Sequence, residues 1–159
     1  MELNLKFVGL RRKVLGPEHR HTLSSMANLA STYSDQGKYE EAVELNLKVV
    51  GLHRKVLGPE HPDTLSSMAN LASIYSKQGK YEEAVELNLM VVGLRRKVQG
   101  PEHPDTLRSM ASLASTYLDQ GKYEEAVELN LKVVGLRRKV LGPEHRHTLR
   151  SMANLASTY

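Results

Sequence analysis

The sequence predicts an all-α protein built as an α-solenoid, in which antiparallel helix pairs stack on one another. Three observations predict it: a 42-residue internal repeat, two glycine breakers in each repeat, and apolar residues spaced three and four positions apart between the breakers. One such helix pair cannot bury its apolar side alone, whereas stacked pairs can. The fold class therefore follows from the repeat before any single residue is interpreted.

The 42-residue period is preserved almost without change between repeats. Residues 44–85 align with residues 86–127 and differ at eight positions. One set of glycines is Gly37, Gly79 and Gly121, and the other is Gly16, Gly58, Gly100 and Gly142. We expect a single repeat domain over 1–159, with a partial second helix at 1–16, three helix pairs at 17–58, 59–100 and 101–142, and a partial first helix at 143–159.

The first helix of each pair is predicted over 61–78 in the central repeat. Pro62 suits a first helical position, Asp63 favours the positive end of the helix dipole, and Gly79 is a natural stop. The apolar positions of this helix are Leu65, Met68, Leu71, Ala72 and Tyr75. Their spacing predicts one buried side.

The second helix is predicted over 80–99 and ends before Gly100-Pro101. Its apolar residues are Tyr81, Ala84, Val85, Leu87, Val91, Val92, Leu94 and Val98. They cover a wide arc of the helix, so we expect this helix to contact neighbours on more than one side.

The segment from Asn70 to Ala84, Asn-Leu-Ala-x-x-Tyr-x-x-x-Gly-Lys-Tyr-Glu-Glu-Ala, resembles a tetratricopeptide repeat. The long second helix and the Gly-Pro-Glu-His-Pro-Asp-Thr linker at 100–106 resemble the 42-residue variety found in kinesin light chains and in fungal and bacterial arrays. The resemblance implies a right-handed superhelix whose first helices line a concave groove for extended peptides. The sequence departs from that pattern in the second helix, with Asn46, Asn88 and Asn130 at a usually bulky position and Val49, Val91 and Val133 at a usually small one.

A polar stripe on the first helices is the candidate binding surface. By repeat it consists of Ser24, Asn28, Ser31 and Asp35, then Ser66, Asn70, Ser73 and Lys77, then Arg108, Ser112, Ser115 and Asp119, and finally Arg150, Asn154 and Ser157. The i, i+4, i+7, i+11 spacing puts each set on one side of its helix, and the resemblance places that side in the groove. Asn amides would hold a peptide backbone, and the arginines would select acidic residues. The alternative is that these small polar residues form an ordinary solvated helix surface without a binding role.

The carboxylate clamp of chaperone-binding family members is not expected here, because Ala69 and Ser73 stand at the matching positions. Basic triplets recur at 11–13, 53–55, 95–97 and 137–139. They lie near the ends of the second helices, where they complement the dipole, and no aromatic residue is interleaved for base stacking. The net charge of +4 is spread over the repeats, so we expect no nucleic-acid partner.

Metal, cofactor and catalytic chemistry find little support in the sequence. His19 and His21 form a short His-Arg-His segment that recurs at His145 and His147, but no carboxylate or cysteine cluster completes a zinc site. No phosphate loop is present, and the polar groups recur in every repeat rather than in one singular arrangement. We predict no enzyme activity, no metal and no cofactor.

The two function classes left open are a scaffold for a protein or peptide partner and a self-assembly unit. The unpaired half-repeats at the two ends could join chains head to tail, and the Gln-Gly-Lys turns could permit domain swapping into a homo-oligomer. No apolar run is long enough for a membrane span, and there is no cysteine. We therefore expect a cytoplasmic protein without a membrane partner.

Overall fold

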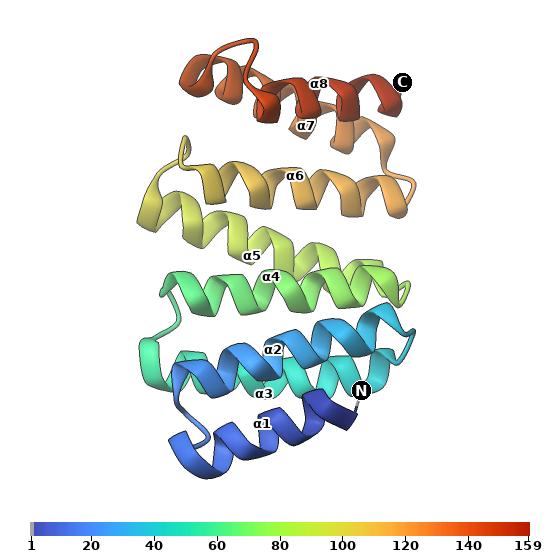
Figure 1. Cartoon of the computed structure of the whole chain (residues 1–159). Helices are drawn as coiled ribbons and strands as arrows, with labels where there is room; N and C mark the ends of the chain where they lie inside the picture. Colours follow the sequence, from blue (N-terminus) through green and yellow to red (C-terminus); the bar gives the residue numbers. More distant parts are fainter. Residues whose placement is uncertain (1) are drawn as a thin grey trace. The chain divides into compact units, whose positions relative to one another are not determined.

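The computed structural model describes residues 2–159, and its secondary structure is entirely helical over that range. The elements are α1 (Glu2–Leu15), α2 (Arg20–Asp35), α3 (Tyr39–Leu57), α4 (Pro62–Lys77), α5 (Tyr81–Gln99), α6 (Pro104–Asp119), α7 (Tyr123–Leu141) and α8 (Arg146–Thr158) (Figure 1). The all-α fold class is confirmed, and the central repeat's helices begin and end within one residue of the predicted limits.

The helices fall into two compact units, Met1–Lys80 with α1 to α4 and Tyr81–Tyr159 with α5 to α8. In the first unit each helix packs on the next along the chain, and α2 also contacts α4. In the second unit α5 packs on α6, α6 on α7, and α7 on α8. The contact of α2 with α4 places two first helices next to each other. The 42-residue boundaries inside these units remain a prediction.

Each first helix begins with a histidine cap. The Nδ1 atom of His61 accepts a hydrogen bond from the backbone N–H of Asp63 at 3.1 Å, and Pro62 occupies the first turn. The helices α2 and α8 lack the proline and the acid, yet they begin at the equivalent residues Arg20 and Arg146. The histidine cap, which all four first helices share, is therefore sufficient to set where the helix begins.

A buried threonine ties each linker to the helix that follows. Thr64 has no exposed surface, and its Oγ1 donates to the carbonyl oxygen of Gly58 at 2.8 Å. The same bond recurs from Thr22 to Gly16, Thr106 to Gly100 and Thr148 to Gly142. This threonine was not among the predicted buried residues, and its hydrogen bond joins the first turn of each first helix to the end of the second helix before it.

Glycine ends the first helices as predicted. Gly79 has a φ of 82°, in the left-handed region that favours glycine. The next residue, Lys80, then donates its N–H back to the carbonyl oxygen of Tyr75 at 2.9 Å. This closing bond satisfies a carbonyl at the helix end and lets the chain turn directly into α5.

The core consists of aliphatic residues from both helix types. One cluster in the first unit centres on Leu23, Met26 and Val49, and one in the second on Leu107, Met110, Leu113, Val92 and Val133. The predicted set was wrong at Val98, which is 45% exposed, and Tyr75 is only half-buried. Polar residues share the interior instead: Asn46, Asn88 and Asn130 are all buried. The second helices thus bury an amide where the usual family pattern has a bulky side chain.

Candidate functional site

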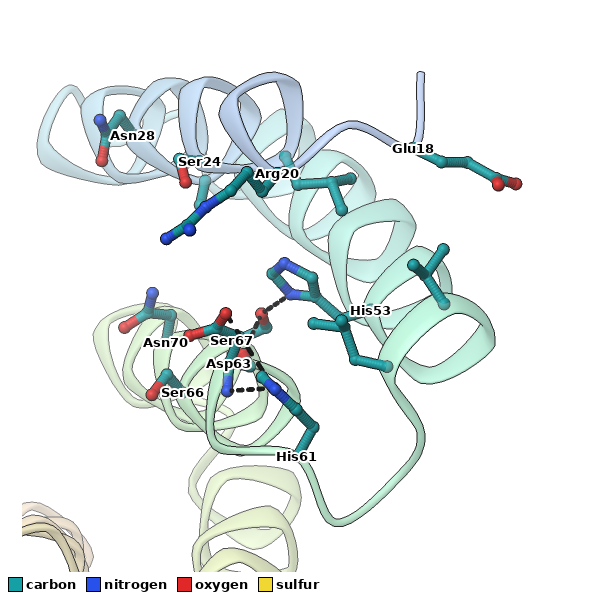
Figure 2. A pocket seen from close by; sticks show the side chains of 14 residues that line it. Glu18, Arg20, Ser24, Asn28, His53, His61, Asp63, Ser66, Ser67 and Asn70 are labelled. Carbon is teal, nitrogen blue, oxygen red and sulfur yellow. Dashed lines mark hydrogen bonds and ion pairs between the residues drawn. The ribbon is translucent and has the colours of Figure 1, made fainter. Parts of the chain in front are cut away.

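The polar stripe is solvent-exposed in every repeat, as its spacing predicted. In the first unit, stripe residues of α2 and α4 border a common cavity of ≈ 470 Å³. Ser24 and Asn28 come from α2, and Ser66 and Asn70 come from α4 (Figure 2). The structure therefore brings the stripes of two successive repeats to one hollow.

A second cavity of ≈ 160 Å³ continues along the same two helices. It is lined by Ser31 and Ser73, and it shares Asn28 and Asn70 with the first cavity. Together the two cavities form what we call the α2–α4 groove, whose polar edges are Ser24, Asn28, Ser31, Ser66, Asn70 and Ser73. At its end, Lys77 pairs with Asp35 at 2.8 Å across the two helices.

Two buried polar atoms at the second cavity have no hydrogen-bond partner within the described residues. They are the Oγ of Ser34 and the Oδ1 of Asn46, whose residues are 4% and 1% exposed. The Nδ2 of Asn46 does donate to the carbonyl oxygen of Ser67, at 3.3 Å. A buried polar atom without a partner costs about 1–3 kcal/mol, so these two atoms reduce the local stability of the packing beneath the groove.

Charged groups of both signs surround the wider end of the groove. Arg20 extends from α2 toward the hollow, His53 enters it from α3, and Asp63 stands at the start of α4 (Figure 2). Burial lowers the pKa of His53, and the carboxylate of Asp63 opposes that shift. Glu18 is paired with Lys55 on α3. This end of the groove is therefore close to balanced in charge.

The residues of each basic triplet differ in burial. The first residue of the triplet turns inward in the last three repeats: His53, Arg95 and Arg137 are 9%, 5% and 6% exposed. The Nη1 of Arg95 donates to Ser109 Oγ at 2.6 Å and to the carbonyl oxygen of Asp105 at 3.1 Å. Only the second and third residues of these triplets remain as surface charges at the helix ends. Helical spacing is the signal that could have found the inward residue, because Arg95 follows the buried Val91 by four positions and Asn88 by seven.

In the second unit, the arginines of the polar stripe line a cavity, whereas its serines and Asn154 do not. Arg108 of α6 and Arg150 of α8 line a cavity of ≈ 130 Å³ together with Arg137 of α7. Ser112, Ser115 and Asn154 are exposed on the same two helices. The Nη2 of Arg108 also pairs with Asp105 one turn earlier. The two predicted arginines thus share one hollow, with a buried third guanidinium that sequence reasoning missed.

Among residues 2–159, no group of three or more His, Asp or Glu side chains is close enough to hold a metal ion. The paired histidines His19 and His21 lie with ring centroids 5.2 Å apart, and His19 serves as the cap of α2. None of these helices has the length and apolar character needed to cross a bilayer.

Comparison with known proteins identifies the repeat. The tetratricopeptide repeat family model matches residues 22–63, 64–105 and 106–147. The chain belongs to the tetratricopeptide repeat family. Proteins of this family generally mediate protein–protein interaction, so the coarse description of the chain is a helical interaction scaffold.

Two solved structures of the kinesin light chain-like, nearly identical TPR-like repeats of Podosopora anserina are similar to this chain at 40% identity. One, a form with a single substitution, has a TM-score of 0.84 and is aligned over 99% of this chain and 74% of its own. The other has a TM-score of 0.82 and is aligned over 99% and 75%. BtubC (BKLC) from P. vanneervenii shares the fold at 16% identity, with a TM-score of 0.75 over 87% of this chain and 55% of its own. A comparison with curated proteins gives no match.

Proposed function

We propose that this tetratricopeptide repeat chain is a non-catalytic scaffold that binds an extended segment of a partner protein in the α2–α4 groove. The observation that carries the proposal is the pair Asn28 and Asn70, which border both cavities of the groove from equivalent positions of adjacent repeats. A primary amide both donates and accepts, so each can bond the C=O and the N–H of a peptide backbone.

The spacing of the two amides suits an extended chain. Packed helices lie about 8–10 Å apart, and an extended peptide rises about 3.3 Å per residue. Equivalent atoms on α2 and α4 therefore match backbone groups about three residues apart. The small side chains of Ser24, Ser31, Ser66 and Ser73 leave room for the peptide along the groove.

The test begins with peptides selected by display on the whole chain, with their affinities measured by fluorescence anisotropy. The double variant Asn28→Ala/Asn70→Ala is compared with Asn154→Ala, which removes the same exposed amide from α8, outside this groove. Each lost backbone hydrogen bond contributes about 1 kcal/mol. We expect the double variant to weaken binding about tenfold or more and the control to stay close to the parent. Equal affinities for the parent and the double variant would overturn the proposal.

A second candidate function is self-assembly, and one observation favours it. Leu149 and Met152 of α8 are 51% and 43% exposed, whereas the equivalent Leu107 and Met110 of α6 are buried. A second copy could cover this apolar surface with a second-type helix such as α1, in the way α7 covers α6. Light scattering over a wide range of protein concentrations measures the absolute mass and tests this candidate. A mass that rises with concentration would support self-assembly, and a constant mass of 17.8 kDa would exclude it.

The proposal places the scaffold in the cytoplasm. The chain has no cysteine, which suits a reducing compartment. Fractionation of the cells that produce it is the direct check, and recovery with secreted or membrane material would contradict this location.

A further inference from the structure

The cavity of the second unit has a charged lining dominated by arginine. Its ≈ 130 Å³ lie among α6, α7 and α8, and Arg108, Arg137 and Arg150 line it together with Glu102. His147, at the start of α8, lies beside them. Three guanidinium groups at one small hollow repel each other unless a negative charge lies among them.

Arg137 is the most constrained of the three. It is 6% exposed, and its Nη1 donates to Ser151 Oγ and, at 3.3 Å, to the carbonyl oxygen of His147. The matching Arg95 has the carboxylate of Asp105 nearby, which raises its pKa and partly offsets the effect of burial. At Arg137 burial lowers the pKa, and the neighbouring charges of Arg150 and Arg108 lower it further. Within the part of the chain that the structure describes, Arg137 has no nearby carboxylate like that of Asp105, because His147 occupies the equivalent position at the start of α8.

The acids around the cavity are already paired. Asp105 pairs with Arg108, and Glu102 pairs with Lys139. Arg150 makes no ion pair or hydrogen bond within residues 2–159. Counting Lys139 with the three arginines, the site and its ion-pair partners have four cations and the two carboxylates of Asp105 and Glu102, an excess of two positive charges.

The first unit contains the equivalent hollow with fewer positive charges, and Arg20 is the arginine of its lining. There the positions of Arg108 and Arg150 are taken by Ser24 and Ser66, and that of Arg137 by His53. The acid is also present there, since Asp63 stands at the position of His147. The arginine cluster is therefore a property of α6, α7 and α8 rather than of the repeat, and the α2–α4 groove provides an internal comparison.

We propose that Arg108, Arg137 and Arg150 form an oxyanion site that binds the phosphate group of a phosphorylated partner segment. Planar guanidinium forks donate paired hydrogen bonds to phosphate oxygens, and a phosphate carries up to two negative charges at neutral pH. A dianion matches the charge surplus of the site better than a single carboxylate does. The identity of the carrier as a peptide rests on the proposed function, whereas the phosphate site itself does not depend on it.

The test uses the whole ¹⁵N-labelled chain, titrated at low salt with three probes: inorganic phosphate, N-acetyl-phosphoserine amide and N-acetyl-aspartate amide. We expect saturable shifts at Arg108 and Arg150 with both phosphate probes, and none at Ser24 or Ser66. N-acetyl-aspartate amide should bind at least several-fold more weakly, because it carries one charge. Added sodium chloride should weaken all binding.

Matched variants identify the residues responsible. Arg108→Ser/Arg150→Ser copies Ser24 and Ser66, so it is compatible with the fold, and it should weaken phosphate binding about tenfold or more. His147→Asp, which copies Asp63 and Asp105, should also weaken it by adding a competing carboxylate. The control Arg54→Ser/Arg96→Ser removes the same net charge from exposed positions and should bind like the parent.

Three results would overturn the proposal. The first is the absence of saturable shifts with either phosphate probe. The second is equal binding by Arg108→Ser/Arg150→Ser and the parent, which would make the shifts a general salt effect. The third is equal affinity for aspartate and phosphoserine amides, which would make the site a carboxylate site. Binding of inorganic phosphate without phosphoserine amide would reject the peptide carrier. A loss of peptide binding in the α2–α4 groove variants leaves these titrations unaffected, so the two proposals fail separately.

Discussion

Replacing Asp105 with histidine should destabilise α6 by about 1–2 kcal/mol, because three interactions of its carboxylate are lost. Asp105 lies in the first turn of α6, where a negative charge contributes about 0.3–1 kcal/mol. It pairs with Arg108 at i, i+3, for about 0.2–0.5 kcal/mol. Its carboxylate also lies near the buried Arg95, and losing that partly buried interaction costs up to about 1 kcal/mol.

The chain offers the reciprocal experiment. His147 stands at the equivalent position of α8, close to Arg137 and Arg150. His147→Asp should recover most of the same three interactions and stabilise α8 by about 1 kcal/mol. The proposal of an anion site in this cavity and this stability prediction both follow from the same missing carboxylate.

The assay is urea unfolding followed by circular dichroism at pH 8 and low salt, with hydrogen exchange of α6 and α8 read by mass spectrometry. Hydrogen exchange is needed because repeats can open separately, and one midpoint then does not describe the chain. Half-molar sodium chloride should shrink both effects. The reasoning is refuted if Asp105→His leaves α6 protected as in the parent, or if His147→Asp lowers the protection of α8.

Three further predictions follow from buried residues. Burial lowers the pKa of His53 below 6.5, so the unfolded chain takes up the proton first, and stability should fall as the pH drops from 8 to 5. His53→Arg should reduce that fall in urea midpoints, and an unchanged slope would contradict it. Asn46→Leu should raise the free energy of unfolding by about 1 kcal/mol, because Asn46 Oδ1 lacks a partner. Asn88→Leu should lower it by a similar amount, because Asn88 donates to Thr116 Oγ1 at 3.1 Å; equal effects would reject the explanation. Leu65→Ala, at a site with no exposure, should cost about 3 kcal/mol in the same assay, and a cost below about 1 kcal/mol would show that the pocket collapses.

The sequence predicted the helices well because several local signals agreed at each boundary. Around α4, Pro62 begins the helix, Gly79 ends it, and the apolar spacing fills the interval. The exposed polar stripe followed from the same periodicity. Because the repeats are nearly identical, the same signals mark the equivalent helix boundary in each repeat.

The interior polar residues could not be predicted, because they depend on contacts between helices. Arg95 shares a side of α5 with the apolar Val91, four positions earlier, but only the packing of α5 on α6 shows that Ser109 holds its guanidinium. Asn46 and Asn88 are equivalent by sequence, yet the exchange of Ile74 for Thr116 gives only the second a hydroxyl partner. Small differences between repeats are therefore where the two units acquire separate chemistry.

The most direct test of the scaffold account is a map of where a selected peptide lies on the chain. Chemical shifts of the ¹⁵N-labelled protein would be followed while a display-selected peptide is added. The account predicts the largest shifts at Ser24, Asn28, Ser66 and Asn70, along the α2–α4 groove. Shifts confined to the apolar surfaces of α1 and α8, with these four residues unmoved, would contradict it and make assembly the leading function.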